Sequence, residues 1–214
     1  MKARRAWIAG ATGVVGAYCL DALLADPVYG DVQAFTRRPL SRTDARLTTN
    51  VIDFDGLASL PAPQPVDDAY CCLGTTMKQA GSRAAFERVD YEYVRAYADL
   101  AARSGASQFL LVSAVGADTR SSIYYSQVKG RAEEAVQAMP FRTVHLFRPS
   151  LLMGPRPEQR RGESISKAIA PLFAPLLLGP LARYRPVHAC DVALRMIAVA
   201  KQDQSGRHVH YFTE

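Results

Sequence analysis

A phenol and an ammonium stand four residues apart in the stretch YYSQVKG, residues 124–130. The flanking pattern predicts a helix, and positions i and i+4 of a helix share a face, so Tyr125 and Lys129 should project side by side. A phenol, with an ordinary pKa of about 10, is a poor base near neutral pH unless a nearby positive charge favours the phenolate. Lys129 can supply that charge. Because such pairs are also common on solvated helix faces, the rest of the chain has to decide between the two interpretations.

A serine hydroxyl is expected in the same crevice. The run QFLLVSAVGA predicts a buried strand, and Ser113 lies near its carboxyl edge, twelve residues before Tyr125. In this arrangement Tyr125 gives a proton to a carbonyl oxygen while a hydride arrives from a cofactor, Ser113 hydrogen-bonds that oxygen, and Lys129 holds a ribose and tunes Tyr125. The reverse reaction oxidises an alcohol.

A glycine-rich turn supplies the context for such a cofactor. GATGVVG, from Gly10 to Gly16, directly follows the strand-like run AWIAG and opens a helix. Gly10 allows the sharp exit from the strand, Gly13 lets backbone approach a pyrophosphate, and Gly16 allows close packing of helix and sheet. The free N–H groups at the start of the helix favour phosphate. A tight turn without a ligand is the alternative.

The end of the second predicted strand indicates which dinucleotide would bind. An NAD-selective enzyme normally places a carboxylate there for the ribose 2′-hydroxyl, but this chain reads AFTRRPL, with Arg37 and Arg38 at that distance from the glycines. Two guanidiniums suit a 2′-phosphate. We therefore expect NADP(H), against the alternative of two solvated arginines.

Two further strand ends should reach the same ligand, because ligands gather at the carboxyl ends of parallel strands. Asp53 and Phe54 follow the third strand and could border adenine, although Asp53 is equally well explained as a turn residue. Residues Cys72 to Thr75, within CCLGTT, follow the fourth strand and could border ribose and pyrophosphate, with Gly74 admitting the cofactor closely.

The order of elements predicts the fold class. Strand-like runs rich in Val, Leu, Phe and Ala alternate with helical patterns, including a long helix at about residues 82–104. This predicts an α/β protein with a doubly wound, mainly parallel Rossmann-like sheet and helices on both faces. We expect one NAD(P)-binding domain over residues 1–214, with a small substrate-side cap inserted at about 154–190.

Composition narrows the classes of partner. The 214 residues are 49% hydrophobic and carry a formal charge of +6, but the arginine clusters are not interleaved with aromatic residues, so we expect no nucleic acid. The apolar run at 171–182 is too short to cross a bilayer, so no membrane is expected and cytoplasmic residence is the default. Four cysteines without metal-ligand spacing, and the lone His188 at a strand end, are expected to be structural, with no metal.

The chain resembles the atypical branch of the short-chain dehydrogenase/reductase superfamily that contains the Tat-interacting-protein-like oxidoreductases. The resemblance is carried by GATGVVG, TRRPL, CLGTT with VDYEYV, FLLVSAVGAD, YYSQVKG and FRPSLLMGPR. It implies a Rossmann-like NADPH fold with a Ser-Tyr-Lys site at Ser113, Tyr125 and Lys129. Asp90 stands where many members place an asparagine that supports a proton-relay water, which puts that relay in doubt.

The same resemblance suggests that the turn after the sixth strand passes the nicotinamide carboxamide. Arg148, just before this turn, is either part of it or an ion-pair residue at the edge of the core. The expected cofactor contacts are Gly10, Thr12, Gly13, Val15, Gly16, Arg37, Arg38, Asp53, Phe54, Cys72, Leu73, Gly74, Thr75, Tyr125, Lys129, Pro149, Ser150 and Leu151.

The predicted function is NADPH-dependent reduction of a carbonyl or related small molecule. The alternative is an NADP(H)-binding, redox-sensing regulator with little or no turnover, and an epimerase or dehydratase that uses transient hydride transfer would need the same residues. The expected partner is a small-molecule substrate, and a homodimer is left open. Arg156, Arg160 and Arg161 could meet an acidic substrate, although a solvated charged loop explains them more simply.

Overall fold

The computed structural model describes residues 3–61, 65–154 and 179–213. Its centre is a seven-stranded sheet in the order β3-β2-β1-β4-β5-β6-β9, in which every neighbouring pair is parallel. The predicted doubly wound parallel sheet is therefore confirmed. Its strands are β1 (Arg4–Ala9), β2 (Tyr29–Thr36), β3 (Leu47–Val51), β4 (Asp68–Cys71), β5 (Gln108–Val112), β6 (Thr143–Phe147) and β9 (Gly206–His210).

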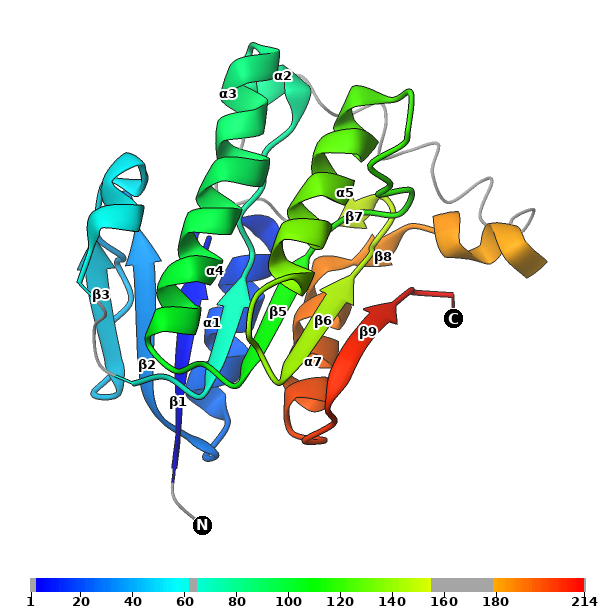
Figure 1. Cartoon of the computed structure of the whole chain (residues 1–214). Helices are drawn as coiled ribbons and strands as arrows, with labels where there is room; N and C mark the ends of the chain where they lie inside the picture. The colour runs from blue at the N-terminus through cyan, green and yellow to red at the C-terminus, as the bar shows by residue number, and fades with distance from the viewer. Residues whose placement is uncertain (1–2, 62–64, 155–178, 214) are drawn as a thin grey trace.

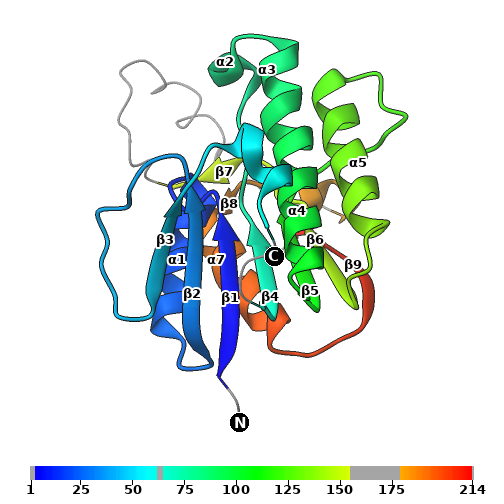
Figure 2. The same cartoon turned by 60° about the vertical axis from the view of Figure 1, so that its left-hand side comes forward.

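Helices cover both faces of the sheet (Figure 1). On one face lie α1 (Val14–Ala25) and α7 (Ala189–Ala200), and on the other lie α4 (Tyr93–Arg103) and α5 (Tyr124–Gln137). Figure 2 shows the sheet between these two layers. Alternate residues of β1 enter opposite cores, Ile8 on the α1 side and Trp7 on the α4 side, as expected for a strand buried on both faces.

The long helix expected at about residues 82–104 is present as a continuous helical run over 83–103, but it contains a π turn that the sequence analysis does not predict. Helix α3 (Arg83–Glu87) runs into a π-helical turn, η2 (Arg88–Glu92), before α4 begins. A π turn accommodates one extra residue per turn, so side chains before and after it face different directions from those of a continuous α-helix. Asp90 lies inside this turn and is fully buried.

Several short helices and strands lie between the main elements of the chain. They are the 3-10 helices η1 (Phe54–Ser59) and η4 (Gly179–Tyr184), helix α2 (Met77–Ala80), and the two-stranded pair β7 (Leu152–Met153) and β8 (Val187–His188). Most of the cap predicted at about 154–190 lies outside the described residues. The assignment of a single domain with a cap therefore stays a prediction.

Three histidines meet where β6 pairs with the edge strand β9. His145 is fully buried, its Nδ1 lies 3.1 Å from Nε2 of His210, and its ring stacks on His208 with centroids 5.0 Å apart. Burial, and then the neighbouring His210 and His208, lower the pKa of His145 to about 4. Burial, and then Arg195 and His208, lower the pKa of His210 to about 4 as well. The native pair therefore resists protonation.

This pair should make stability fall in mild acid. A histidine whose folded pKa is depressed stabilises the fold above its unfolded pKa of 6.5, and that contribution is lost as the pH falls toward 4. Counting the pair as one titrating site, we expect the protein to lose about 2 kcal/mol more between pH 7 and pH 4.5 than the double variant His145→Phe/His210→Phe. Urea unfolding at the two pH values measures the difference.

The control variant is His188→Gln, which removes an exposed histidine and should leave the pH dependence unchanged. Burial raises the pKa of Asp68 to about 6, so this residue increases the stability of the fold as the pH falls below 6. Asp68 is present in all three proteins, so its contribution cancels in the comparison. If the parent protein and the double variant lost equal unfolding free energy between the two pH values, the lowered pKa values assigned to His145 and His210 would be contradicted.

Candidate active site

The glycine turn forms a close backbone contact between β1, α1 and the end of β4. Gly10 has φ +84°, and a Cβ built on it would lie 2.4 Å from the carbonyl oxygen of Cys72. A Cβ on Gly16 would lie 2.0 Å from the carbonyl oxygen of Gly10. No side chain caps the start of α1, whose N-cap is Gly13. The described residues thus place no side-chain acceptor on the first N–H groups of this twelve-residue helix, where a phosphate would be favoured. Binding of a pyrophosphate by the turn around Thr12 and Val15 stays a prediction.

Arg37 and Arg38 directly follow β2, whose end lies beside the end of β1 in the sheet. Both side chains are exposed, and neither has an ion-pair partner among the described residues. Arg42, by contrast, pairs with Asp21 of α1. Within the described residues, no ion pair therefore neutralises the two arginines expected to meet a 2′-phosphate, which stand at the edge where the glycine turn lies.

The contacts expected after β3 divide into two kinds. Asp53 caps η1, because its side chain accepts a hydrogen bond from the backbone N–H of Asp55 at 3.1 Å. This is the turn role that the sequence left open. Phe54 is buried, and its ring lies 5.5 Å from that of Tyr93. Asp53 still stands at the carboxyl edge of the sheet, so capping does not remove it from the expected adenine side.

A buried ion pair joins the turn after β4 to α5. The Nζ of Lys129 lies 2.7 Å from Oδ1 of Asp90, and their side chains are only 6% and 0% exposed. The second carboxylate oxygen, Oδ2, accepts the backbone N–H of Thr75 at 2.8 Å. Burial alone would lower the pKa of Lys129, but the Asp90 carboxylate, and then Tyr125, outweigh it, so the pKa lies above its ordinary value. Lys129 is therefore held as a cation.

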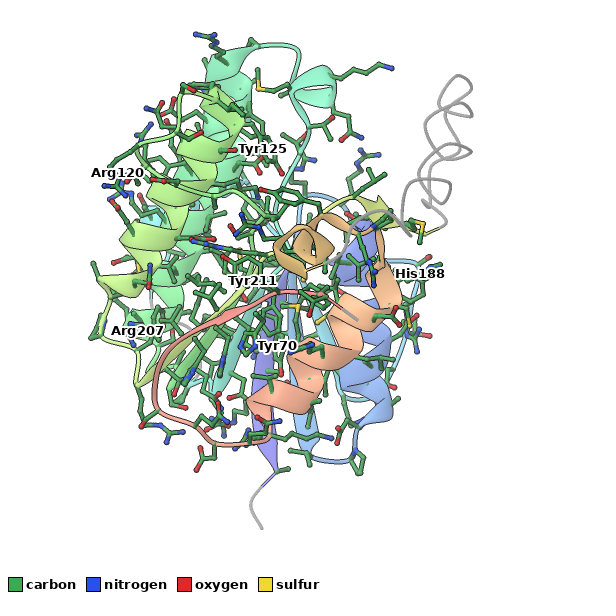
Figure 3. The ribbon with its side chains drawn as sticks, turned by 90° about the vertical axis from the view of Figure 1, so that its right-hand side faces the viewer. Tyr70, Arg120, Tyr125, His188, Arg207 and Tyr211 are labelled. Atoms are coloured by element: carbon green, nitrogen blue, oxygen red, sulfur yellow. The ribbon has the colours of Figure 1, made fainter. Side chains whose placement is uncertain are left out.

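Tyr125 and Ser113 are the other two residues of the predicted Ser-Tyr-Lys set. Tyr125 lies one helical turn before Lys129 on α5, as predicted, and is one of the residues whose charge acts on Lys129. Ser113 follows β5; its side chain is buried, and its Oγ meets no hydrogen-bond partner among the described residues. A buried hydroxyl without a partner is costly unless a ligand satisfies it. Figure 3 shows Tyr125 in the upper part of the molecule, whereas Arg207, near the start of β9, lies lower.

Aromatic and charged neighbours hold the start of α5 in place. The ring of the fully buried Phe86 lies 5.4 Å from that of Tyr125 and 6.2 Å from that of Tyr124. The hydroxyl of Tyr124 donates to Glu87 at 2.7 Å, and Glu87 also pairs with Arg131 at 2.5 Å. Tyr124 thus has a structural partner, while the described residues give the Tyr125 hydroxyl no hydrogen bond.

Arg148 has the ion-pair role that the sequence left open. Its guanidinium pairs with the buried Glu133 of α5, and Nη1 donates to the hydroxyl of Tyr211 at 2.7 Å. The residues that follow are also tied down, since the carbonyl of Pro149 accepts the N–H of Val115 at 2.9 Å and Ser150 donates to the carbonyl of Arg185. Leu151 is 52% exposed at this edge, and contacts of this turn with a cofactor stay a prediction.

A separate hollow of about 460 Å³ lies on another face of α5. Its acidic groups are already paired within the protein, Glu133 with Arg148 and Glu134 with the hydroxyl of Thr119. It does not include Ser113, Tyr125 or Lys129. The lining residues are Ala117, Asp118, Thr119, Arg120, Gly130, Glu133, Glu134, Gln137 and Arg148.

The remaining candidates have structural surroundings. Burial raises the pKa of Cys71 to about 12, and a hydrogen bond with Cys19, followed by burial, raises that of Cys72, so both thiols are poor nucleophiles. Cys72 and Leu73 are partly buried against the two cores. His188 is the exposed N-cap of α7. In the described residues no three His, Cys, Asp or Glu side chains form a metal-binding group. Arg156, Arg160 and Arg161 lie outside the described residues.

A comparison with family models shows which protein family the chain belongs to. Residues 6–212 match the NAD dependent epimerase/dehydratase family. The chain belongs to this family. Among curated proteins, this family member is 37% identical over 171 residues to Protein HTATIP2 of Rattus norvegicus, covering 78% of this chain and 70% of the relative. The resemblance to the Tat-interacting-protein-like oxidoreductases is thereby confirmed.

Solved structures confirm the Rossmann-like fold. The model aligns with MoeE5 in complex with UDP-glucose and NAD at a TM-score of 0.70 and 16% identity, covering 98% of this chain and 76% of that one. It aligns with DesIV, a dTDP-glucose 4,6-dehydratase from Streptomyces venezuelae with NAD and TYD bound, at 0.70 and 17% identity, covering 97% and 76%. These likenesses show the Rossmann-like α/β fold.

The expectation of cytoplasmic residence is contradicted. Fmp52 of Emericella nidulans is 34% identical over 168 residues, covering 75% of this chain and 72% of the relative, and its name describes it as mitochondrial. Fungal relatives from Aspergillus terreus, Scheffersomyces stipitis and Eremothecium gossypii carry the same description. Composition could not reveal this. In the described part of the chain, no helix is long and apolar enough to span a membrane.

The glycine turn makes a direct prediction about stability. Gly10→Ala places a methyl group against the Cys72 carbonyl at a residue with positive φ, so we expect a loss of about 2–4 kcal/mol in unfolding free energy together with weaker dinucleotide binding. Gly56→Ala is the matched control, because a Cβ there meets nothing within 4 Å, and it should change stability by less than about 0.5 kcal/mol. Chemical denaturation measures both. Equal stability of the two variants would refute the close contact.

Proposed function

We propose that the protein is an NADPH-dependent oxidoreductase that reduces a carbonyl or related small molecule, with Tyr125 as the proton donor. The observation that carries this proposal is the buried cation Lys129 one helical turn after Tyr125, in a chain whose Ser113 hydroxyl, just after the end of β5, is buried without a hydrogen-bond partner among the described residues. A protein that only senses a dinucleotide has no chemical need for such a serine, tyrosine and lysine. The family match supports dinucleotide-dependent chemistry in general.

The residues fit the cofactor in three places. The open start of α1 would hold the pyrophosphate, Arg37 and Arg38 would hold the 2′-phosphate, and Lys129 would donate to the ribose. When bound, NADPH supplies the hydride that reaches the carbonyl carbon. Tyr125 transfers its phenolic proton to the carbonyl oxygen, and the Ser113 hydroxyl donates a hydrogen bond to that oxygen as negative charge develops.

A specific loss is expected for the proton donor. Tyr125→Phe removes the acidic proton but keeps the ring that contacts Phe86, so turnover should fall at least about a hundredfold while NADPH affinity stays within about twofold. Tyr124→Phe is the matched control, because the Tyr124 hydroxyl bonds to Glu87 and not to the proposed substrate position. NADPH oxidation over a panel of aldehydes and ketones, with fluorescence titration of NADPH, measures both quantities. Full activity in Tyr125→Phe would sink the assignment.

The choice between NADPH and NADH depends on two exposed guanidiniums. Arg37→Ala/Arg38→Ala should weaken NADPH binding by about tenfold to a hundredfold and leave NADH binding nearly unchanged, since only NADPH carries the 2′-phosphate. Arg120→Ala, which removes an exposed arginine next to Asp118, serves as the control for net charge. Isothermal titration with each nucleotide measures the preference. Tighter binding of NADH than of NADPH to the parent protein would contradict the role of both arginines.

Two other functions are outcomes of the same measurements. Tight NADPH binding without consumption across the carbonyl panel, together with capture of a partner protein, would favour the regulatory alternative. Conversion of a substrate without net consumption of the nucleotide would favour an epimerase or dehydratase, which the family description includes. The UDP-glucose bound by MoeE5 and the TYD bound by DesIV belong to those proteins. A homodimer also stays a proposal, and light scattering after gel filtration tests it.

A further inference from the structure

The charge of the catalytic lysine is balanced inside the protein. Lys129 and Asp90 are both buried, and the 2.7 Å between Nζ and Oδ1 leaves no room for a water molecule between them. Taking a single ion out of water is far more costly than burying a pair, so each group makes the burial of the other possible. Tyr125, one turn away on α5, therefore faces an ammonium whose charge is already opposed by a carboxylate.

The same carboxylate holds the turn that would carry the cofactor. Its Oδ2 accepts the N–H of Thr75 at 2.8 Å, while a Cβ on Gly74 would lie 3.4 Å from Oδ1 and 3.5 Å from Nζ. The chain after β4 thus runs directly over the ion pair. The π turn η2 supplies the carboxylate. Three separate segments, η2, α5 and the turn after β4, therefore meet at one ion pair.

Resting on the proposed reductase function, we infer that Asp90 is a positioning residue for the reduction: by pairing with Lys129 it keeps the proton on Tyr125 and fixes the Thr75 turn against α5. A free ammonium beside Tyr125 would favour the phenolate, which is the form needed to oxidise an alcohol. A balanced pair favours the phenol, which is the form that gives its proton to the carbonyl oxygen as the hydride reaches the carbon. The pH range in which Tyr125 can give its proton in the reduction is thereby extended upward.

Other groups near the pair do not replace this effect. In the described residues, the groups that act on Lys129 from neighbouring elements are Asp90, Tyr125 and the thiol of Cys71, whose pKa burial raises to about 12, so that it stays neutral. Glu87 of α3 is compensated by Arg131 and by the hydroxyl of Tyr124. Ser113, at the end of β5, is uncharged.

A double-mutant cycle on the ionisation of Tyr125 tests the inference without any substrate. The near-ultraviolet tyrosinate signal is titrated for the parent protein, Asp90→Asn, Lys129→Met and the double variant, each compared with the same protein carrying Tyr125→Phe. We expect the midpoint of Tyr125 ionisation to fall by about one pH unit or more in Asp90→Asn, to rise in Lys129→Met, and to return close to the parent value in the double variant. Asp90→Glu, which keeps the charge, should also titrate close to the parent.

An unchanged midpoint in folded Asp90→Asn would overturn the inference. If Asp90→Asn does not fold, the comparison moves to Lys129→Met against the double variant, where equal midpoints would overturn it and a lower midpoint in the double variant would support it. In the reduction assay, the alkaline limb of the pH profile should shift with the titration. A failed reductase assay with the expected titration cycle would refute the proposed function but leave the balance of charge at Tyr125 established.

Discussion

The buried pair of Lys129 and Asp90 is the constraint on which the geometry of the site depends. Neither ion could be buried alone at acceptable cost, so α5, the π turn η2 and the turn after β4 must come together for the protein to fold as described. The contact between these three segments also fixes the position of Tyr125, because Tyr125 lies one turn before Lys129 on the same helix. The geometry of the candidate site and the folding of the chain are therefore coupled through one interaction.

The glycine turn, where the proposed nucleotide would bind, depends on backbone contacts instead of charge. Gly10, Gly16 and the Cys72 carbonyl approach each other more closely than any side chain would allow, and this lets the start of α1 open at the edge of β1 and β4. The parallel topology then delivers the ends of β2, β4 and β5 to the same edge. The arginines, the Thr75 turn and Ser113 consequently come from segments far apart in sequence but close in the sheet.

Much of this arrangement follows from local patterns in the sequence. Runs of buried residues with helices between them predict the sheet, and the glycine spacing predicts the opening of α1. The i, i+4 spacing of Tyr125 and Lys129 is likewise fixed once α5 is recognised as a helix. These features depend on residues that are neighbours along the chain, which is why they could be predicted.

What could not be predicted depends on contacts between distant segments. The spacing of hydrophobic residues does not reveal the π turn at Asp90. The ion pair of Asp90 with Lys129 forms only because α5 lies beside this turn. The partner of Arg148 was undecided because Glu133 is on a different element, and the histidine group exists only through the register of β6 and β9. Asp53 could be a ligand or a cap, and only the geometry of η1 shows that it caps.

A crystal structure of the protein with NADP+ would test the central claim most directly. The account predicts the pyrophosphate at the first turn of α1, the 2′-phosphate within hydrogen-bond distance of Arg37 or Arg38, and the nicotinamide ring beside the hydroxyls of Ser113 and Tyr125, with the pair of Lys129 and Asp90 intact. A nucleotide bound elsewhere, or a nicotinamide ring directed away from Tyr125 with the phenol in bulk water, would contradict it.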